Sequence, residues 1–202
     1  MRLLRRFLFV LWGIVVVGAG NGIGWAGTPT DQIRETTDKI LKIVSDPALK
    51  GEAHAADRRR RIRAVVDERF DWEEMSRRTL ARHWRKRTPA EKKEFIRLFG
   101  HLLERTYLDR VEGYSGEKVI YEGEAVDGDY GIVKVKIVTR KETEIPVKYR
   151  VKRKDGQWYV YDISIQGVSL INNYRRQFNS IIVGSSYKKL IKKLKAKVES
   201  GT

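Results

Sequence analysis

The sequence predicts an α+β domain in which helices pack around a curved antiparallel sheet of about four strands, with an apolar pocket between them. The first half of the chain repeats apolar residues at helical spacing, the middle alternates apolar and basic residues, and the C-terminal segment returns to helical spacing. The chain has 202 residues and is 41% hydrophobic and 34% charged, which is a globular composition. It has no cysteine, which excludes disulfides, zinc–thiolate sites and cysteine nucleophiles.

The first 26 residues have the layout of a cleavable secretory signal peptide. An arginine-rich start precedes an apolar run from Phe7 to Val17, and Gly24 and Ala26 supply the small residues of a cleavage site after Ala26. The alternative is an uncleaved membrane anchor, but the run has 11 residues and a spanning helix needs roughly 20. We therefore expect residues 1–26 to be removed and residues 27–202 to form one domain.

Two helices are expected in the segment that follows. Thr28 to Leu49 places Ile33 and Ile40 on one helical face, and Pro47 should end or kink this helix. A loop is expected over Lys50 to Ala56. Asp57 to Phe70 then repeats apolar residues at helical spacing, which predicts the second helix.

Two further helix starts are marked by capping residues. Asp71, with Glu74 three residues later, predicts a capping box before a short helix that carries Met75, Leu80 and Trp84. The sequence Thr88-Pro89-Ala90-Glu91 predicts the start of a long helix, because Thr caps the end and Pro suits the first turn. That helix has a wide apolar stripe, which requires a large apolar partner. The stripe consists of Phe95, Leu98, Phe99, Leu102, Leu103, Thr106 and Tyr107.

The segment from Gly113 to Lys118 breaks the helical pattern, and the apolar period then changes to two. Each predicted strand is apolar on one face and basic on the other, so its apolar face should meet the helices. Hairpin turns are expected at Asp127-Gly128 and at Asp155-Gly156. The strands are predicted from Val119, around Val133, Val135 and Ile137, around Ile145, Val147, Tyr149 and Val151, and from Trp158 to Ile165.

Two helices are expected at the C-terminal end. The first follows Gly167 and carries Leu170, Tyr174 and Phe178 on its apolar side. Gly184-Ser185 interrupts the pattern. The last helix has Tyr187 and other apolar residues on one side and six lysines on the other, which suits a membrane surface or an ordinary packed helix.

The stretch Ile165 to Phe178 raises the question of a catalytic serine. Strand, Gly167-Val168-Ser169 and helix resemble the start of a hydrolase nucleophile elbow. The elbow needs a second small residue where Ile171 stands, and no histidine follows Ser169. Ser169 is therefore interpreted as a helix cap, with Gly167 turning the corner.

Asp162 is the remaining catalytic candidate. It lies inside an apolar strand, where burial could raise its pKa and make it a base, as in cone-shaped α+β isomerases. It could equally cap a helix or pair with an arginine. The three histidines, His54, His83 and His101, lack metal-ligand spacing, and the carboxylates between Asp67 and Glu74 alternate with arginines as in ordinary ion pairs. We expect no metal, no cofactor and no catalytic residue.

The net charge is +16, or +13 without the three arginines of the first 26 residues. Such a charge attracts nucleic acid or anionic membrane surfaces. The basic run Arg82 to Arg87, with Trp84, resembles a nucleic-acid patch or an ordinary solvated helix face. Export disfavours nucleic acid, so phospholipid head groups and acidic proteins remain as partners.

Two long blocks of the chain resemble the MlaC-type proteins, also called toluene-tolerance auxiliary proteins. DWEEMSRRTLARHWRKRTPAEKKEFIRLFGHLLERTYLDRVEGYSGEKV, Asp71 to Val119, is similar to the signature region of the family. WYVYDISIQGVSLINNYRRQFNSII, Trp158 to Ile182, is similar to its second signature, which ends in N-Y-R-x-Q-F. The resemblance covers nearly all of the chain after the signal peptide and is looser over Ser185 to Val198.

The resemblance implies a periplasmic carrier of glycerophospholipids that works with an inner-membrane ABC transporter and an outer-membrane lipoprotein complex. It implies an α+β fold with the acyl tails between helices and sheet and phospholipid as cargo, and we expect a monomer. A related branch that accompanies hopanoid synthesis is an alternative. So are an isomerase-like enzyme that uses Asp162 and a basic adaptor without a ligand.

Periodicity and the two signature blocks select the residues expected to enclose the tails. We call them the predicted wall residues. They are Phe99, Leu103, Tyr107, Val133, Val135, Val147, Tyr149, Val151, Leu170, Tyr174 and Phe178.

Overall fold

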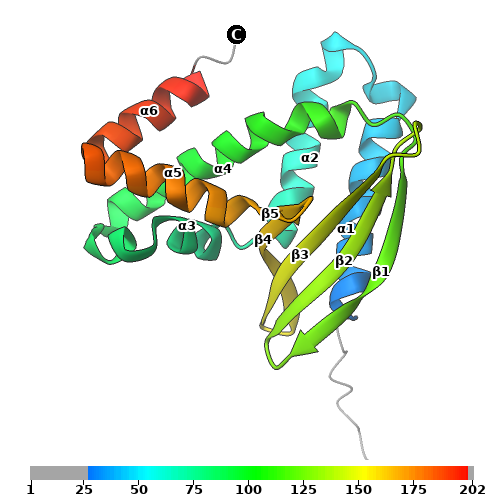
Figure 1. Cartoon of the computed structure of the whole chain (residues 1–202). Helices are drawn as coiled ribbons and strands as arrows, with labels where there is room; N and C mark the ends of the chain where they lie inside the picture. Colours follow the sequence, from blue (N-terminus) through cyan, green and yellow to red (C-terminus); the bar gives the residue numbers. More distant parts are fainter. Residues whose placement is uncertain (1–26, 200–202) are drawn as a thin grey trace, which may run out of the picture.

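The computed structural model describes residues 27–199, which form six α-helices and a five-stranded antiparallel sheet (Figure 1). The predicted signal peptide lies outside the described residues. The helices are α1 (Pro29–Ser45), α2 (Ala55–Arg69), α3 (Trp72–Leu80), α4 (Pro89–Glu112), α5 (Leu170–Gly184) and α6 (Tyr187–Glu199). The strands are β1 (Lys118–Asp127), β2 (Tyr130–Val138), β3 (Glu144–Lys154), β4 (Gln157–Ile165) and β5 (Val168–Ser169). None of the described helices combines the length and the apolar character that crossing a membrane would require.

The strands pair in chain order, and each is antiparallel to the next. The predicted class is therefore confirmed, and the two-residue β5 adds a fifth strand to the four expected. Gln166 and Gly167 both have positive φ, 50° and 81°, so the chain makes a tight turn and Val168 pairs back onto Ile165. A two-residue strand is too short to show an alternating pattern, which is why periodicity missed it.

Most predicted helix boundaries are confirmed by their caps. Thr28 and Thr88 form complete capping boxes, with Asp31 and Glu91 as the reciprocal residues. The Ser169 hydroxyl accepts from the Asn172 N–H at 3.1 Å, which confirms Ser169 as a helix cap. The α1 helix ends at Ser45, before Pro47, and the expected loop after it contains two short 3-10 helices, η1 (Pro47–Leu49) and η2 (Glu52–His54).

The predicted capping box at Asp71 is only half formed. The Asp71 carboxylate accepts from the Glu74 N–H at 2.8 Å. The Glu74 carboxylate instead binds Arg77 and Arg78, because these side chains lie one turn further along the same helix face. Trp84 also lies outside the short helix, in a 3-10 segment η3 (Ala81–Lys86) that begins where Ala81 adopts a φ of 47°.

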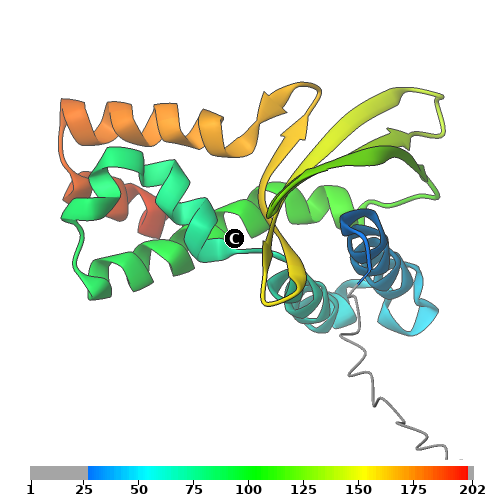
Figure 2. The same cartoon turned by 90° about the horizontal axis from the view of Figure 1, so that it is seen from below.

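The apolar residues form two separate cores. The first belongs to what we call the helical lobe, Trp72–Glu112 and Leu170–Glu199, which contains α3 to α6. The second lies between the inner face of the sheet and α1, where Ile33 packs against the valines of β2 and β3. Figure 2 shows α1, α2 and the C-terminal half of α4 on one side of the sheet. We call that side of the sheet its inner face.

Strand β4 takes part in both cores. Its Trp158 and Val160 side chains belong to the sheet core, whereas Tyr161 belongs to the core of the helical lobe. Asp162 and Ser164 are also buried, so the strand has neither face in water. The extra residue is accommodated by a register shift opposite Arg150 and Val151.

A buried arginine ties α1 and α2 to the start of β4. The Arg69 guanidinium donates to the Trp158 carbonyl at 2.8 Å, to the Thr36 hydroxyl at 3.1 Å and to the Gln32 side-chain carbonyl. The Gln32 oxygen also accepts from the Trp158 N–H at 2.9 Å. Burial lowers the pKa of Arg69 from its ordinary value. Neutral oxygens therefore satisfy this guanidinium at the junction of three elements.

Candidate functional site

The predicted wall residues separate into a sheet group and a helix group. Val133, Val135, Val147 and Val151 are buried in the sheet core, with Tyr149 half-buried beside them. The strand register explains the grouping, because Val135 lies opposite Val147 and Val133 lies opposite Tyr149. The alternating pattern of the sequence therefore identified one continuous apolar face.

The helix group lies mainly in the core of the helical lobe. Phe99, Tyr174 and Phe178 contact one another, with ring centroids 5.5 to 5.8 Å apart. Phe95 completes this aromatic cluster, at 5.7 Å from Phe99 and 5.9 Å from Phe178. These distances are those of packed aromatic pairs, so in this conformation the rings contact each other and do not face the sheet valines.

The remaining three helix residues lie further from that cluster. Leu103 is buried on α4, and Tyr107 is half-buried one turn beyond it, towards the end where α4 connects to β1. Leu170 is buried in the first turn of α5. Burial raises the pKa of the Tyr107 hydroxyl, with Tyr174 adding to the effect. Residue spacing had placed all six helix residues on one wall, whereas the structure spreads them along two helices.

The inner face of the sheet changes character along its length. Val133 and Val151 are fully buried under α1. Towards the end that receives the chain from α4, the inner face carries apolar residues that are only half-buried (Figure 1). They are Val119, Ile137, Ile145, Tyr149 and Ile163, and we call them the half-buried stripe.

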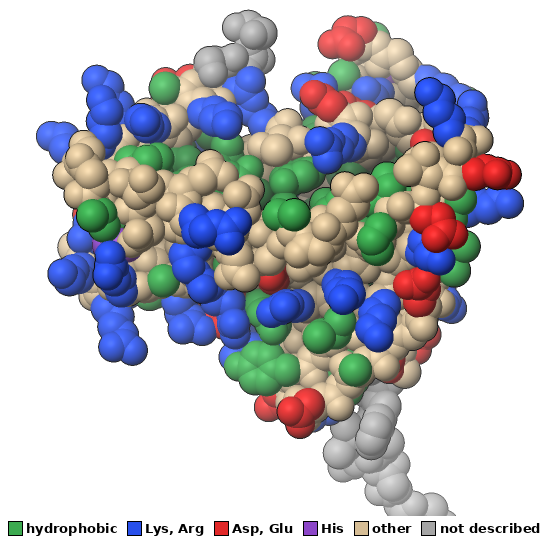
Figure 3. All heavy atoms as spheres, in the orientation of Figure 1, with side chains coloured by type: hydrophobic (Ala, Val, Ile, Leu, Met, Phe, Trp, Pro, Cys, Tyr) green, Lys and Arg blue, Asp and Glu red, His purple; other side chains and the backbone are tan. Residues whose placement is uncertain are grey.

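The register makes the half-buried stripe continuous. Val119 lies opposite Ile137, Ile137 opposite Ile145, and Tyr149 opposite Ile163. Desolvation raises the pKa of Tyr149 to about 12, so its hydroxyl lies in apolar surroundings. Desolvation also raises the pKa of Tyr121 on the neighbouring strand. Figure 3 shows apolar side chains gathered in the hollowed centre of one face, between the helical lobe and the sheet.

Most of the half-buried stripe was not among the predicted wall residues. Ile137 and Ile145 belong to the same alternating runs as the selected valines, so the signal was present in the sequence. Ile163 was harder to find, because almost every residue of β4 is apolar or buried and the strand shows no alternation.

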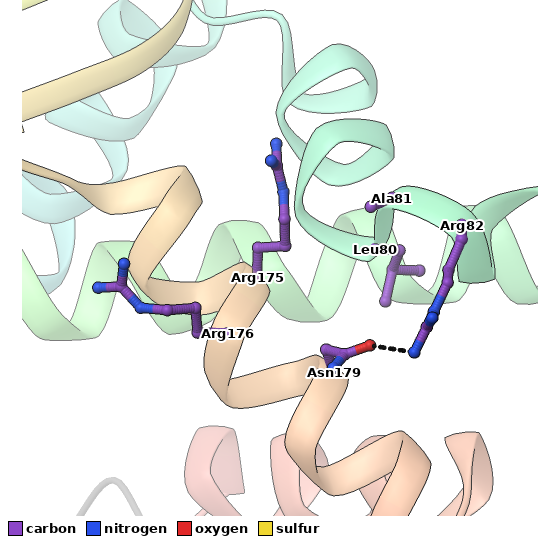
Figure 4. Close-up of a pocket in the computed structure, with 6 residues that line it drawn as sticks. All are labelled: Leu80, Ala81, Arg82, Arg175, Arg176 and Asn179. Carbon is purple, nitrogen blue, oxygen red and sulfur yellow. Dashed lines mark hydrogen bonds between the residues drawn. The ribbon is translucent and has the colours of Figure 1, made fainter.

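Two shallow hollows are present in the described surface, and neither lies on the inner face of the sheet. One, of about 260 Å³, is lined by Leu80, Ala81, Arg82, Arg175, Arg176 and Asn179 (Figure 4). The other, of about 250 Å³, is lined by Phe70, Asp71, Trp72, Lys154, Asp155 and Tyr159. Both are smaller than the roughly 300 to 1,000 Å³ of ordinary ligand pockets. Neither contains a predicted wall residue.

Asp162 is occupied by structural hydrogen bonds. Its carboxylate accepts from the Ser169 hydroxyl at 2.6 Å and from the Ile171 N–H at 3.1 Å. The Arg150 guanidinium lies 4.0 Å away, and the Asp162 side chain is 5% exposed. The carboxylate therefore holds the first turn of α5 against β4, on the side of the strand that faces the helical lobe.

The histidines and carboxylates form no metal site in the part of the chain that the structure describes. His83 lies 3.0 Å from the Asn179 side-chain oxygen, and His101 lies 3.4 Å from Glu104. The acidic residues between Asp67 and Glu74 bind arginines of α2 and α3, as their alternation with basic residues predicted.

Comparison with known proteins gives three findings. The family model described as "MlaC protein" matches residues 34–196. A curated protein of Haemophilus influenzae, named "Intermembrane phospholipid transport system binding protein MlaC", is 30% identical over 115 residues. That alignment covers 54% of each chain, so the chain spans about half the length of this curated relative.

The third finding is a solved structure. It is described as a phospholipid-binding protein from Ralstonia solanacearum in complex with a phospholipid. The two structures superpose with a TM-score of 0.74, which covers 86% of this chain and 98% of the other, at 23% sequence identity. The likeness therefore extends over most of the fold described above.

Proposed function

The chain belongs to the MlaC family, and on that premise we propose that it is a non-enzymatic periplasmic carrier of glycerophospholipids. In this proposal it moves lipid between an inner-membrane ABC transporter complex and an outer-membrane lipoprotein complex, and so maintains the lipid asymmetry of the outer membrane. The family match supports the class of protein, and the phospholipid-bound structure of the Ralstonia protein, which shares the fold, supports the class of cargo.

The half-buried stripe is the observation that supports lipid binding most directly. A protein core normally buries its large apolar side chains completely, whereas this stripe leaves five contiguous ones half-covered on the inner face. Apolar side chains on both sides of a gap between sheet and helices can enclose a hydrocarbon chain without any catalytic group. We therefore propose the stripe, the sheet group, Leu103 and Tyr107 as the surface that contacts the acyl tails.

The energy of acyl-chain exposure explains why a carrier must enclose the tails. Each methylene removed from water contributes roughly 0.8 kcal/mol, so a whole acyl chain contributes on the order of 10 kcal/mol. A polar head group can stay at the mouth of the site in water. Such tails would leave slowly without help, so we expect a partner complex to open the site for loading and release.

Binding requires the helices to move relative to the sheet. The two described hollows are too small for acyl tails and lie elsewhere, so space must be created at the stripe. The contacts between α2 and α4 suit such a movement because they are ionic. Arg58 binds Glu112 at 2.8 Å and Arg63 binds Glu104 at 2.9 Å. Ion pairs on long side chains can tolerate small shifts that a close-packed apolar interface resists.

Mass spectrometry of organic extracts from the purified mature protein tests the proposal. We expect glycerophospholipids in near-stoichiometric amount. Recovery of hopanoids or other apolar molecules would favour the alternative cargo of the family. Extracts that contain no lipid in repeated preparations, together with no uptake of added phospholipid, would contradict a carrier role.

An enzyme that uses Asp162 is the weaker alternative. Its carboxylate already accepts two hydrogen bonds at the start of α5 and points away from the half-buried stripe. A general base must be within hydrogen-bond reach of the proton that it removes. In this structure those positions are filled by Ser169 and by the backbone of Ile171.

A further inference from the structure

The positive charge of the chain is concentrated in the helical lobe. Residues 72–112 and 170–199 contain 19 basic and 8 acidic side chains, a net charge of +11. The other described residues contain 20 basic and 18 acidic side chains, a net charge of +2. Figure 3 shows the same contrast, with Lys and Arg crowded over the helical lobe and both signs mixed over the sheet.

Most basic residues of the helical lobe have no carboxylate partner among the described residues. On α6, Lys195 binds Glu94 at 2.7 Å, whereas Lys188, Lys189, Lys192 and Lys193 are exposed and make no ion pair in the described structure. In the hollow of Figure 4, Arg82 donates to the Asn179 side-chain oxygen at 3.1 Å. Arg175, also in that hollow, donates to the Arg78 carbonyl at 2.8 Å. These cations are satisfied by neutral groups or by water and keep their charge available.

Two corners of the helical lobe meet and form what we call the tip, residues 85–93 and 183–189. Tyr187 joins them, because its hydroxyl donates to the Glu91 carbonyl at 3.2 Å and its ring lies 4.3 Å from the Arg87 guanidinium. The tip contains seven basic residues and one acidic residue. It also carries Val183, which is 63% exposed and is the most exposed large apolar side chain of the described residues.

We propose that the tip docks onto a bilayer surface that contains anionic phospholipid. Each Lys or Arg near such a surface contributes to binding through the negative surface potential, and an apolar side chain among them can enter the head-group region. Lysines suit this role because they present mobile point charges and no fixed fork for a particular carboxylate. The exposed Val183 at the centre of the charge favours a lipid surface over an acidic protein.

Cosedimentation with vesicles tests the proposal. The mature protein should bind vesicles made of equal parts phosphatidylglycerol and phosphatidylethanolamine, and should not bind vesicles of phosphatidylcholine alone. Binding should weaken steeply as sodium chloride is raised, because exposed charges are screened. The variant Lys86→Glu/Lys93→Glu/Lys188→Glu/Lys189→Glu should bind at least a hundredfold more weakly, since each basic residue contributes about fivefold near such a surface.

A matched control carries the same change of charge on the sheet. Lys134, Lys141, Lys148 and Lys154 are exposed and make no ion pair in the described structure, so all four are replaced by Glu. This control should keep most of the vesicle binding. Equal loss in the two variants would show attraction by total charge and would overturn docking at the tip. Retention of the tip variant on polyglutamate-free but not on anionic vesicles is the expected pattern, whereas tip-dependent binding to polyglutamate without vesicle binding would assign the surface to an acidic protein.

A site-specific label gives a second, independent readout. Because the chain has no cysteine, Val183→Cys allows one environment-sensitive dye to be attached at the tip. Its emission should shift to shorter wavelength when anionic vesicles are added. The same dye at Val126→Cys, an exposed apolar position of β1, should not respond. An unchanged spectrum at position 183 under conditions in which the protein sediments with vesicles would contradict the proposed orientation. Since the tip lies away from the half-buried stripe, these outcomes do not depend on whether lipid is carried.

Discussion

The Ser169 hydroxyl lies 2.6 Å from a carboxylate oxygen of Asp162, at the corner where β4 hands the chain over to α5. The same carboxylate accepts from the Ile171 N–H, and the Ser169 hydroxyl accepts from the Asn172 N–H. Two side chains therefore satisfy two of the free N–H groups at the start of α5. The Gly-x-Ser sequence that resembled a nucleophile elbow is a connection between the sheet and the helical lobe.

We expect Asp162→Ala to lower the free energy of unfolding by about 2 to 3 kcal/mol, because it leaves the Ile171 N–H buried without an acceptor. Ser169→Ala should cost about 1 kcal/mol through loss of the cap. Urea denaturation measures both. The double variant should cost less than the sum, since the two groups are bonded to each other. Strict additivity would show that their hydrogen bond contributes nothing to stability.

Phe178→Ala should lower the free energy of unfolding by about 3 to 5 kcal/mol, because its ring packs among three other buried aromatic rings. Val183→Ala, on the exposed side of the same helix, should change it by no more than about 0.5 kcal/mol. Lipid per folded molecule should be unchanged in both variants. A large loss of lipid from folded Phe178→Ala protein would place this residue at the acyl tails.

Ile145→Asp should reduce the lipid that co-purifies with the protein by several-fold or more, because it puts a charge in the half-buried stripe. Ile120→Asp, on the exposed outer face of β1, is the matched control and should leave the lipid content unchanged. Quantitative mass spectrometry of extracts, normalised to folded protein, gives the comparison. Similar lipid content in both variants would exclude the stripe from the binding surface.

Glu74 makes stability depend on pH. Hydrogen bonds from Arg77 and then Arg78 outweigh desolvation and lower the pKa of Glu74 from 4.5 to about 2. A carboxyl group with a lowered folded-state pKa stabilises the protein above pH 4.5, and that contribution is lost as the pH falls from 4.5 towards 2. We expect about 1 to 2 kcal/mol, a figure reduced because the Arg77 side chain is half exposed.

The variant Glu74→Gln isolates this contribution from those of other carboxyl groups. The difference in unfolding free energy between wild type and variant should be largest near neutral pH and should shrink below pH 4.5. Urea denaturation across this pH range measures it. A difference that stays constant with pH would show that the ion pairs do not set the pKa of Glu74.

The sequence predicts the elements of this fold better than their packing. Capping residues such as Thr88 and Ser169 identify helix starts because local hydrogen bonds alone determine them. The alternating valines identify the inner face of the sheet for a similarly local reason. Periodicity shows which side of a helix is buried but not what covers it, so Phe99 and Val133 were expected in one interior and lie in two.

The same limit applies to the candidate site. Sequence pattern identified Tyr149 and the valines beside it, and it missed the half-covered state of Ile145 and Ile163, which depends on where α1 ends and α4 begins to diverge from the sheet. A strand with both faces buried also hides its own alternation. The run Tyr159-Val160-Tyr161-Asp162-Ile163 carries that signal, because a nearly unbroken apolar strand indicates cover on two sides.

The double burial of β4 has a consequence for how the molecule comes apart. Two cores that were merely linked in sequence could melt one after the other, whereas these two share a strand and neither can lose it without exposing apolar surface of the other. Thermal unfolding should therefore be a single all-or-none transition, with equal calorimetric and van't Hoff enthalpies. Cooperativity across the whole chain would then arise from one strand of nine residues.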